Sequence, residues 1–166
     1  MRDVLAGVVV LILLVTAASL GTTLQAYRRR RLRARDSENA LGRAIIVEIP
    51  AGDDLMLFSE DATRFYYGDR SIDKDLIVAA RVLINGSPIA SCLSRRHEPR
   101  ADRAPTSFED REEGIARDRW DVALETVTGS TLIECGSIRE RVSQELARAV
   151  FDAVKRDMER RDGAQG

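Results

Sequence analysis

The sequence has very few cysteine and histidine side chains. It contains two cysteines, Cys92 and Cys135, and one histidine, His97, among 166 residues. A closed structural zinc site takes four ligands, so these three side chains cannot form one. A catalytic histidine needs a positioned partner and a group that orients it, and His97 lies in a charged stretch that supplies neither, so we interpret it as an exposed loop residue. We predict no metal ligands, no cofactor and no catalytic residue.

The chain also lacks the local motifs by which many enzymes are recognised. It has no G-x-S-x-G, no Walker-type phosphate loop and no G-x-G-x-x-G. The alternating polar residues of Asp69–Asp75 resemble the opening of a calcium loop. However, the sixth position holds Lys74 where glycine is needed, and the twelfth holds Ala80 where glutamate is needed. The sequence therefore favours a protein that is not an enzyme.

One long apolar run stands near the N-terminus. No residue between Val4 and Leu24 is charged, and 21 helical residues span roughly 30 Å, the thickness of a bilayer's hydrocarbon core. A cleaved signal peptide would have a shorter apolar region with its positive charge in front. A buried helix of a soluble domain would need more chain around it than is present. We predict a single transmembrane helix over residues 4–24.

An aromatic residue and six arginines follow this run and are predicted to lie at the membrane interface: Tyr27, Arg28, Arg29, Arg30, Arg31, Arg33 and Arg35. Basic residues beside a membrane segment stay on the cytoplasmic side. We therefore expect residues 1–3 outside and the rest of the chain in the cytoplasm, at a bacterial inner membrane. The arginines also attract anionic lipid head groups; specific phosphoinositide-type or nucleic-acid binding is the sharper but less favoured interpretation.

Charge is divided unevenly along the chain. Residues 1–35 hold seven arginines and one aspartate, which leaves 19 basic and 26 acidic residues in the remainder. An acidic body is repelled by nucleic acid, so we predict no nucleic-acid partner. In the reducing cytoplasm Cys92 and Cys135 are expected to be free thiols that pack as small apolar residues.

A basic juxtamembrane stalk is expected at residues 25–43, with one helical turn within its polar part, residues 35–42. Residues 44–162 then alternate between apolar runs and turn residues. Asn85-Gly86 is the favoured pair for a two-residue hairpin turn, and Pro88 is expected near the start of the returning strand or on a sheet edge. Residues 68–74 and 128–130 are expected to be loops or turns. Strands are predicted at 44–49, 54–59, 63–67, on both sides of Asn85-Gly86 within 75–93, at 120–127 and at 131–135.

Residues 95–119 are charged almost throughout and contain two prolines. Such a composition buries little apolar surface, so we expect a long insertion that separates two otherwise adjacent strands. This insertion and the exposed face of the last helix are the predicted contact regions for a partner. The predicted partner-binding residues are Arg95, Arg96, His97, Phe108 and Trp120.

The chain closes with an amphipathic helix that ends at Gly163, followed by a tail over 163–166. Ser137 and Glu140 match the S-x-x-E capping box. The apolar stripe is predicted to comprise Ile138, Val142, Leu146, Val150, Ala153 and Val154, flanked by Phe151 and Met158. The polar face is predicted to comprise Arg141, Glu145, Arg148, Asp152, Lys155 and Arg156.

These elements predict an α+β protein. A single transmembrane helix precedes a small antiparallel sheet or partly closed barrel of about seven strands, which the C-terminal helix covers. This order of elements is similar to that of pleckstrin-homology-like barrels, in which a final helix plugs one open end; a curved open sheet with one helix on it is the alternative. We predict a non-enzymatic module that binds a protein partner or itself at the membrane. The alternative is a ligand- or lipid-sensing barrel with its pocket between sheet and helix.

Overall fold

The computed structural model describes residues 16, 19, 25, 28–51, 54–95 and 118–164. Nearly all of the predicted transmembrane helix, Tyr27 and three predicted partner-binding residues (Arg96, His97 and Phe108) lie outside the described residues. Within the described part of the chain, no helix combines the length and the apolar character needed to cross a membrane. The chain divides into two compact units, Met1–Leu41 and Gly42–Gly166.

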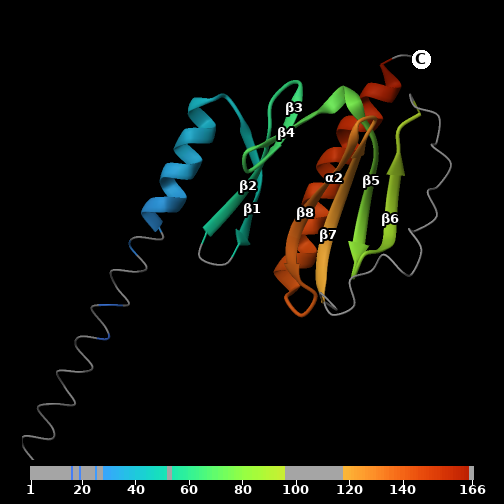
Figure 1. Cartoon of the computed structure of the whole chain (residues 1–166). Coiled ribbons are helices and arrows are strands. Elements are labelled where there is room, and N and C mark those ends of the chain that lie inside the picture. Colours follow the sequence, from blue (N-terminus) through green and yellow to red (C-terminus); the bar gives the residue numbers. More distant parts are fainter. Residues whose placement is uncertain are drawn as a thin grey trace, which may run out of the picture. The chain divides into compact units, whose positions relative to one another are not determined.

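The first unit contains a helix over residues 28–40 (Figure 1). It is longer than the single turn expected for the stalk, because arginine, leucine, alanine and glutamate all favour helix. All six arginines of the predicted membrane interface lie on it, and all six are exposed.

The second unit is α+β, as predicted, with two antiparallel sheets of four strands each and a C-terminal helix (Figure 1). The first sheet has the order β1-β2-β3-β4, and a 3-10 turn, η1 (Lys74–Leu76), leads from it to the second, which has the order β6-β5-β7-β8. The strands are β1 (Ala44–Ala51), β2 (Asp54–Glu60), β3 (Arg64–Tyr67), β4 (Arg70–Asp73), β5 (Ile77–Ile84), β6 (Ser87–Leu93), β7 (Arg119–Thr126) and β8 (Gly129–Ser137), and the helix is α2 (Arg141–Gly163).

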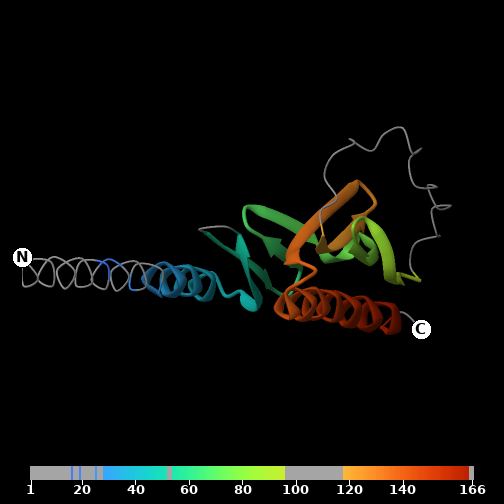
Figure 2. The same ribbon diagram turned by 90° about the horizontal axis from the view of Figure 1, so that it is seen from below.

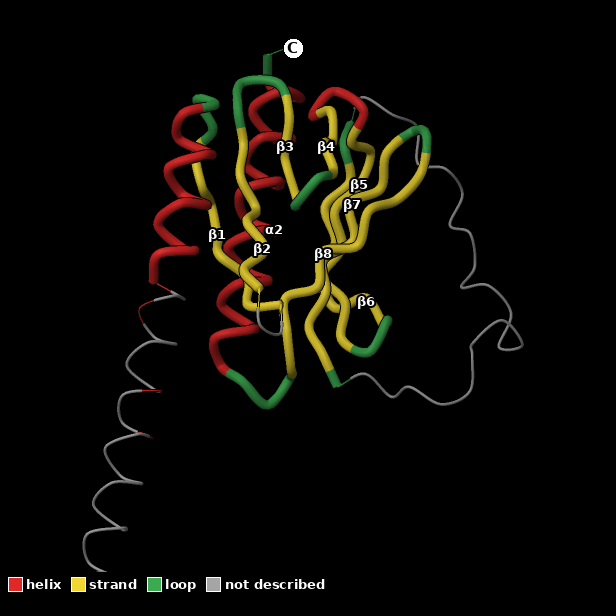
Figure 3. Tube along the Cα trace, turned by 60° about the vertical axis from the view of Figure 1, so that its left-hand side comes forward, coloured by secondary structure: helices red, strands yellow, loops and turns green. Residues whose placement is uncertain are grey.

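The helix α2 lies along one side of the strands (Figures 2 and 3) and contacts β1, β5, β7 and β8. The core lies beneath it and is continuous from the first sheet to the second. The rings of Phe58 and Phe65 stack in this core with centroids 5.5 Å apart. Both phenylalanines are fully buried, together with Val122, Leu124, Ile133, Ala147, Val150 and Val154.

The hairpin predicted at Asn85-Gly86 is confirmed. Asn85 has φ 52° and Gly86 has φ 78°, the left-handed conformation that a tight hairpin turn of this kind requires. Pro88 is the second residue of β6, which is an edge strand, so its missing N–H removes no bond from the sheet interior. The second hairpin, β7–β8, is also confirmed, with its turn at Val127-Thr128 rather than 128–130.

Two expectations about the sheets are wrong. Residues 68–74 are not a loop, because Gly68-Asp69 forms a two-residue turn and β4 pairs with β3. Only one apolar side chain of β4, Ile72, is buried, so the strand shows little hydrophobic pattern. The 95–119 insertion does not separate neighbouring strands either, since β5 lies between β6 and β7. Over the residues that the structure describes, the strands number eight, close to the seven or so expected.

The start of the C-terminal helix also differs from the prediction. The N-cap is Glu140, no side chain caps the helix there, and Ser137 is the last residue of β8. Gly136 has φ 114°, and a Cβ placed on it would lie 2.5 Å from Ser143 Oγ, so helix and strand approach closely here. Of the predicted apolar stripe, Val150 and Val154 are buried and Leu146 and Ala153 are partly buried. Val142 is 59% exposed; the buried face comprises Ser143, Ala147, Val150, Val154, Asp157 and Met158.

The predicted polar face of α2 is confirmed, because all six of its residues are exposed. The helix ends at Gly163, as predicted.

Candidate functional site

A groove of about 650 Å³ opens where the first sheet meets β7 and β8. This volume lies within the range typical of ligand-binding pockets in proteins, roughly 300–1,000 Å³. The groove, called here the seam groove, is lined by Pro50, Ala51, Met56, Tyr67, Gly68, Asp69, Arg70, Arg119, Leu132, Glu134 and Gly136. It lies between the sheets, whereas the sequence-based alternative placed a pocket between sheet and helix.

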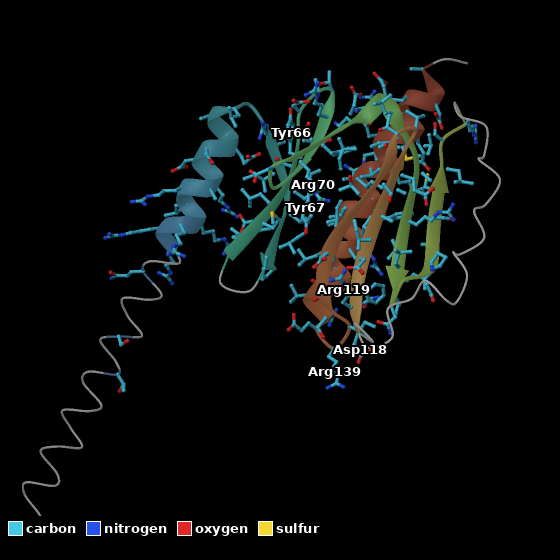
Figure 4. All side chains as sticks on the ribbon, in the orientation of Figure 1. Tyr66, Tyr67, Arg70, Asp118, Arg119 and Arg139 are labelled. Carbon is cyan, nitrogen blue, oxygen red and sulfur yellow. The ribbon has the colours of Figure 1, made fainter. Side chains whose placement is uncertain are left out.

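Tyr67, the last residue of β3, joins the two sheets at this groove (Figure 4). Its hydroxyl oxygen accepts a hydrogen bond of 3.3 Å from the backbone N–H of Glu134 in β8. Burial raises the pKa of Tyr67 above its usual value of 10.0, so the phenol stays protonated at neutral pH. Within the described residues the hydroxyl proton has no hydrogen-bond acceptor. Tyr67 therefore offers a donor to the groove.

Arg119, the first residue of β7, is held by two carboxylates. Its Nε lies 2.9 Å from Asp121, and its Nη1 lies 2.8 Å from Glu134 Oε2. Burial lowers the pKa of Arg119, but the hydrogen bonds and charges of Asp121 and Glu134 outweigh that effect and raise it overall. The side chain of Asp121 is 6% exposed and that of Glu134 is 55% exposed. Arg119 is therefore fixed from the protein side by Asp121, while Glu134 is its solvent-facing partner.

Arg70 and Asp69 are the other charged residues of the lining. Both are exposed, at the turn from β3 to β4. Neither side chain has an ion pair or a hydrogen bond to any residue that the structure describes. The lining therefore holds two arginines and two acidic residues. Arg119 and Glu134 form an ion pair with each other, whereas Arg70 and Asp69 have no side-chain partner among the described residues.

The apolar part of the groove is formed by Pro50, Ala51, Met56 and Leu132. Leu132 is 37% exposed. A Cβ placed on Gly68 would lie 2.6 Å from Met56 Sδ, so the methionine side chain occupies the space that a larger residue at 68 would fill. Methionine adapts its shape readily to a bound side chain.

Two of the predicted partner-binding residues are described, and neither lies in the lining. Arg95 is exposed, and its backbone N–H donates a 2.8 Å hydrogen bond to Asp162 of α2. Trp120 is partly buried, packs against the core and is paired with Gly136. The two residues lie toward opposite ends of β5, because Ser94 N–H bonds to the carbonyl of Val78 whereas Trp120 pairs with Ile84.

Of the two cysteines, Cys135 is 1% exposed and packs in the core as predicted, and burial raises its pKa to about 12. In the described part of the chain, no three histidine, cysteine, aspartate or glutamate side chains are grouped so as to hold a metal ion. Comparisons of the chain with protein-family models, with curated proteins and with solved structures return no match.

Proposed function

We propose that the chain is a non-enzymatic protein-interaction module held at a membrane by its N-terminus, and that a segment of the partner protein binds in the seam groove. The observation that carries the proposal is the composition of the lining: an apolar wall beside one unmatched arginine and one unmatched aspartate. A polypeptide supplies apolar side chains and both signs of charge within a few residues, and it satisfies such a surface better than a ligand of uniform charge.

The membrane part of the proposal rests on the sequence. Residues 4–24 would cross a bacterial inner membrane, with residues 1–3 outside and the second unit in the cytoplasm. The exposed arginines of the 28–40 helix would lie against anionic lipid head groups. Confinement to a surface raises the effective concentration of partners held there, so weak contacts in the groove would suffice.

A ligand- or lipid-sensing barrel of the pleckstrin-homology-like kind is the second candidate, and the groove volume favours it. An anionic lipid head group, however, is normally held by several basic side chains. The groove has two, of which Arg119 already binds Asp121 and Glu134. The balanced charge of the lining therefore supports a protein partner over an anionic lipid.

Site-specific photo-crosslinking in living cells tests the proposal. The photoreactive residue p-benzoyl-phenylalanine replaces Asp69 or Leu132, at the groove, or Thr128, which is exposed in the β7–β8 turn away from the lining. We expect a discrete higher-mass adduct from positions 69 and 132 and none from 128. Equal adducts from all three positions, or none from the two groove positions, would contradict the proposal.

The 95–119 insertion and the exposed face of α2 remain proposed secondary contact regions. A chain in which a Gly/Ser linker replaces residues 96–117 tests the insertion. Asp162 still holds Ser94 and Arg95, and Asn85 still holds Arg119, so the fold should survive. If the adducts from positions 69 and 132 keep their full yield in this variant, the insertion has no part in binding.

A further inference from the structure

The groups of the seam groove that retain unused hydrogen-bonding capacity include two donors on adjacent strands. Tyr67 and Arg70 are paired directly across β3 and β4, and residues directly opposite each other in an antiparallel pair project from the same face of the sheet. Both line the groove (Figure 4). Tyr67 contributes a hydroxyl proton, and Arg70 contributes a guanidinium with no partner among the described residues. The two donors together suit an anionic oxygen acceptor.

We infer that the seam groove recognises one carboxylate on an extended segment of the partner protein. Arg70 pairs with the carboxylate, the Tyr67 hydroxyl donates to it, and a neighbouring apolar side chain packs on Met56 and Leu132. This inference rests on the proposed function and names the chemistry of the partner. It makes Arg70 the residue that determines specificity.

The carboxylates already in the lining limit the charge of the ligand. Asp69 is adjacent to Arg70 in sequence and carries an unmatched negative charge, and Glu134, which is paired with Arg119, is a second carboxylate of the lining. Like charges at such a site disfavour a dianion such as a phosphate monoester more than they disfavour a single carboxylate. A peptide with an acidic side chain next to an apolar one matches both the charge of Arg70 and the apolar wall of the groove.

Glu134 brings a negative charge to the groove, and its backbone N–H bonds to Tyr67. It is 55% exposed and binds Arg119 Nη1, while Asp121 holds the same guanidinium from the buried side. Replacing Glu134 with glutamine removes a negative charge from the groove and weakens the hold on Arg119. The backbone N–H that bonds to Tyr67 remains in place. The inference therefore requires opposite effects: E134Q strengthens carboxylate binding, and R70Q weakens it.

The test uses the full-length chain in phosphatidylcholine nanodiscs and capped, fluorescein-labelled peptides of sequence Ala-Leu-X-Leu-Ala, with X as Asp, Asn or Lys. Fluorescence anisotropy measures their affinities. We expect the Asp peptide to bind about tenfold more tightly than the Asn peptide, which is the lower end of what a charge-assisted hydrogen bond supplies. R70Q should abolish this preference, whereas E134Q should raise the affinity several-fold. The matched control is R64Q, since Arg64 lies on β3, is exposed and does not line the groove.

Equal affinities for the Asp and Asn peptides, or equal effects of R70Q and R64Q, would overturn the inference. Tight binding of inorganic phosphate or of phosphatidylglycerol vesicles that R70Q abolishes would also overturn it, in favour of a phosphate or a lipid head group. The photo-crosslinks from positions 69 and 132 keep the two proposals distinguishable. Crosslinks without a carboxylate preference leave the proposed function standing and remove only this inference.

Discussion

The ammonium group of Lys74 lies 2.7 Å from Glu60 Oε2, and only 2% of the lysine side chain is exposed. The same nitrogen donates to the carbonyl of Asp61 at 2.8 Å, lies 3.6 Å from Asp157 Oδ1 and sits 4.4 Å from the centroid of the Phe65 ring. Asp157 belongs to α2 and is also bonded by Arg161 at 2.7 Å. A buried charge network thus joins the first sheet to the helix.

Removing Lys74 should therefore destabilise the second unit strongly. We expect K74M, which keeps much of the aliphatic stem, to lower the free energy of unfolding by about 3–5 kcal/mol, as found when one member of a buried ion pair is lost. Urea denaturation measures this. The control is K155M, because Lys155 pairs with Glu159 on the exposed face of α2, where such a pair contributes about 0.5 kcal/mol or less. Similar decreases in the free energy of unfolding for both variants would show that the buried ion pairs of Lys74 stabilise the fold no more than an exposed pair does.

The hydrogen bonds to the Asp61 carboxylate predict that the free energy of unfolding depends on pH in the acid range. Hydrogen bonds from the Tyr66 hydroxyl and from the backbone N–H groups of Thr63 and Arg64 hold the pKa of Asp61 below its usual value of 3.8. Because the pKa is lower in the folded state, this stabilisation is present above about pH 4 and is lost as the pH falls through the folded-state pKa.

We expect D61N to be less stable than the natural chain at neutral pH, with the difference shrinking below about pH 4. Thermal unfolding at a series of pH values measures it. The Y66F variant removes the largest cause of the lowered pKa, so its acid dependence should be shallower. If the difference in stability between D61N and the natural chain stayed constant from neutral pH to below pH 4, the lowered pKa of Asp61 would not stabilise the folded state.

Substitution of Gly68 should alter the groove as well as the stability. Gly68 has φ 56°, and its added Cβ would meet Met56 at 2.6 Å; Gly86 has φ 78° with nothing within 4 Å. Both G68A and G86A should lose about 1–2 kcal/mol because alanine is strained in the left-handed region. Only G68A displaces Met56, so only G68A should reduce the crosslinking yield at position 132. Equal crosslinking yields in the two variants would show that Met56 takes no part in binding.

The orientation of the chain can be tested with a single cysteine. In a background where alanine replaces Cys92 and Cys135, R95C places the only thiol at an exposed position of the second unit. We expect a membrane-impermeant maleimide to label R95C in lysed cells and not in intact ones. Labelling of R95C in intact cells would contradict the proposed orientation, because it would place the second unit outside the cytoplasm.

Features set by neighbouring residues were predictable from the sequence, and features set by distant ones were not. Asn85-Gly86 fixes its own turn geometry, and the polar face of α2 follows from its helical period. The strand β4 was missed because backbone pairing and one buried isoleucine hold it in place. Gly68-Asp69 between Tyr67 and Arg70 was the one local signal for that hairpin.

The seam groove had no comparable signal. Its central contact joins Tyr67 to Glu134, 67 residues apart in sequence, and nothing in either neighbourhood specifies the other. The start of α2 likewise differs from the S-x-x-E pattern: its N-cap is Glu140, and Ser143 in its first turn packs closely against Gly136 of β8. The candidate site therefore depends on the packing of the two sheets against each other and could not be predicted from the sequence.

The contact of α2 with β1 has a consequence for biosynthesis. The first strand of the second unit packs against α2, the last element of that unit, so the core of the unit cannot close until α2 has been made. Until then the apolar faces of β1 and β2 would be open to water and to chaperones. Nascent chains arrested before α2 should therefore be sensitive to protease throughout the second unit, and release of α2 should protect all of it at once.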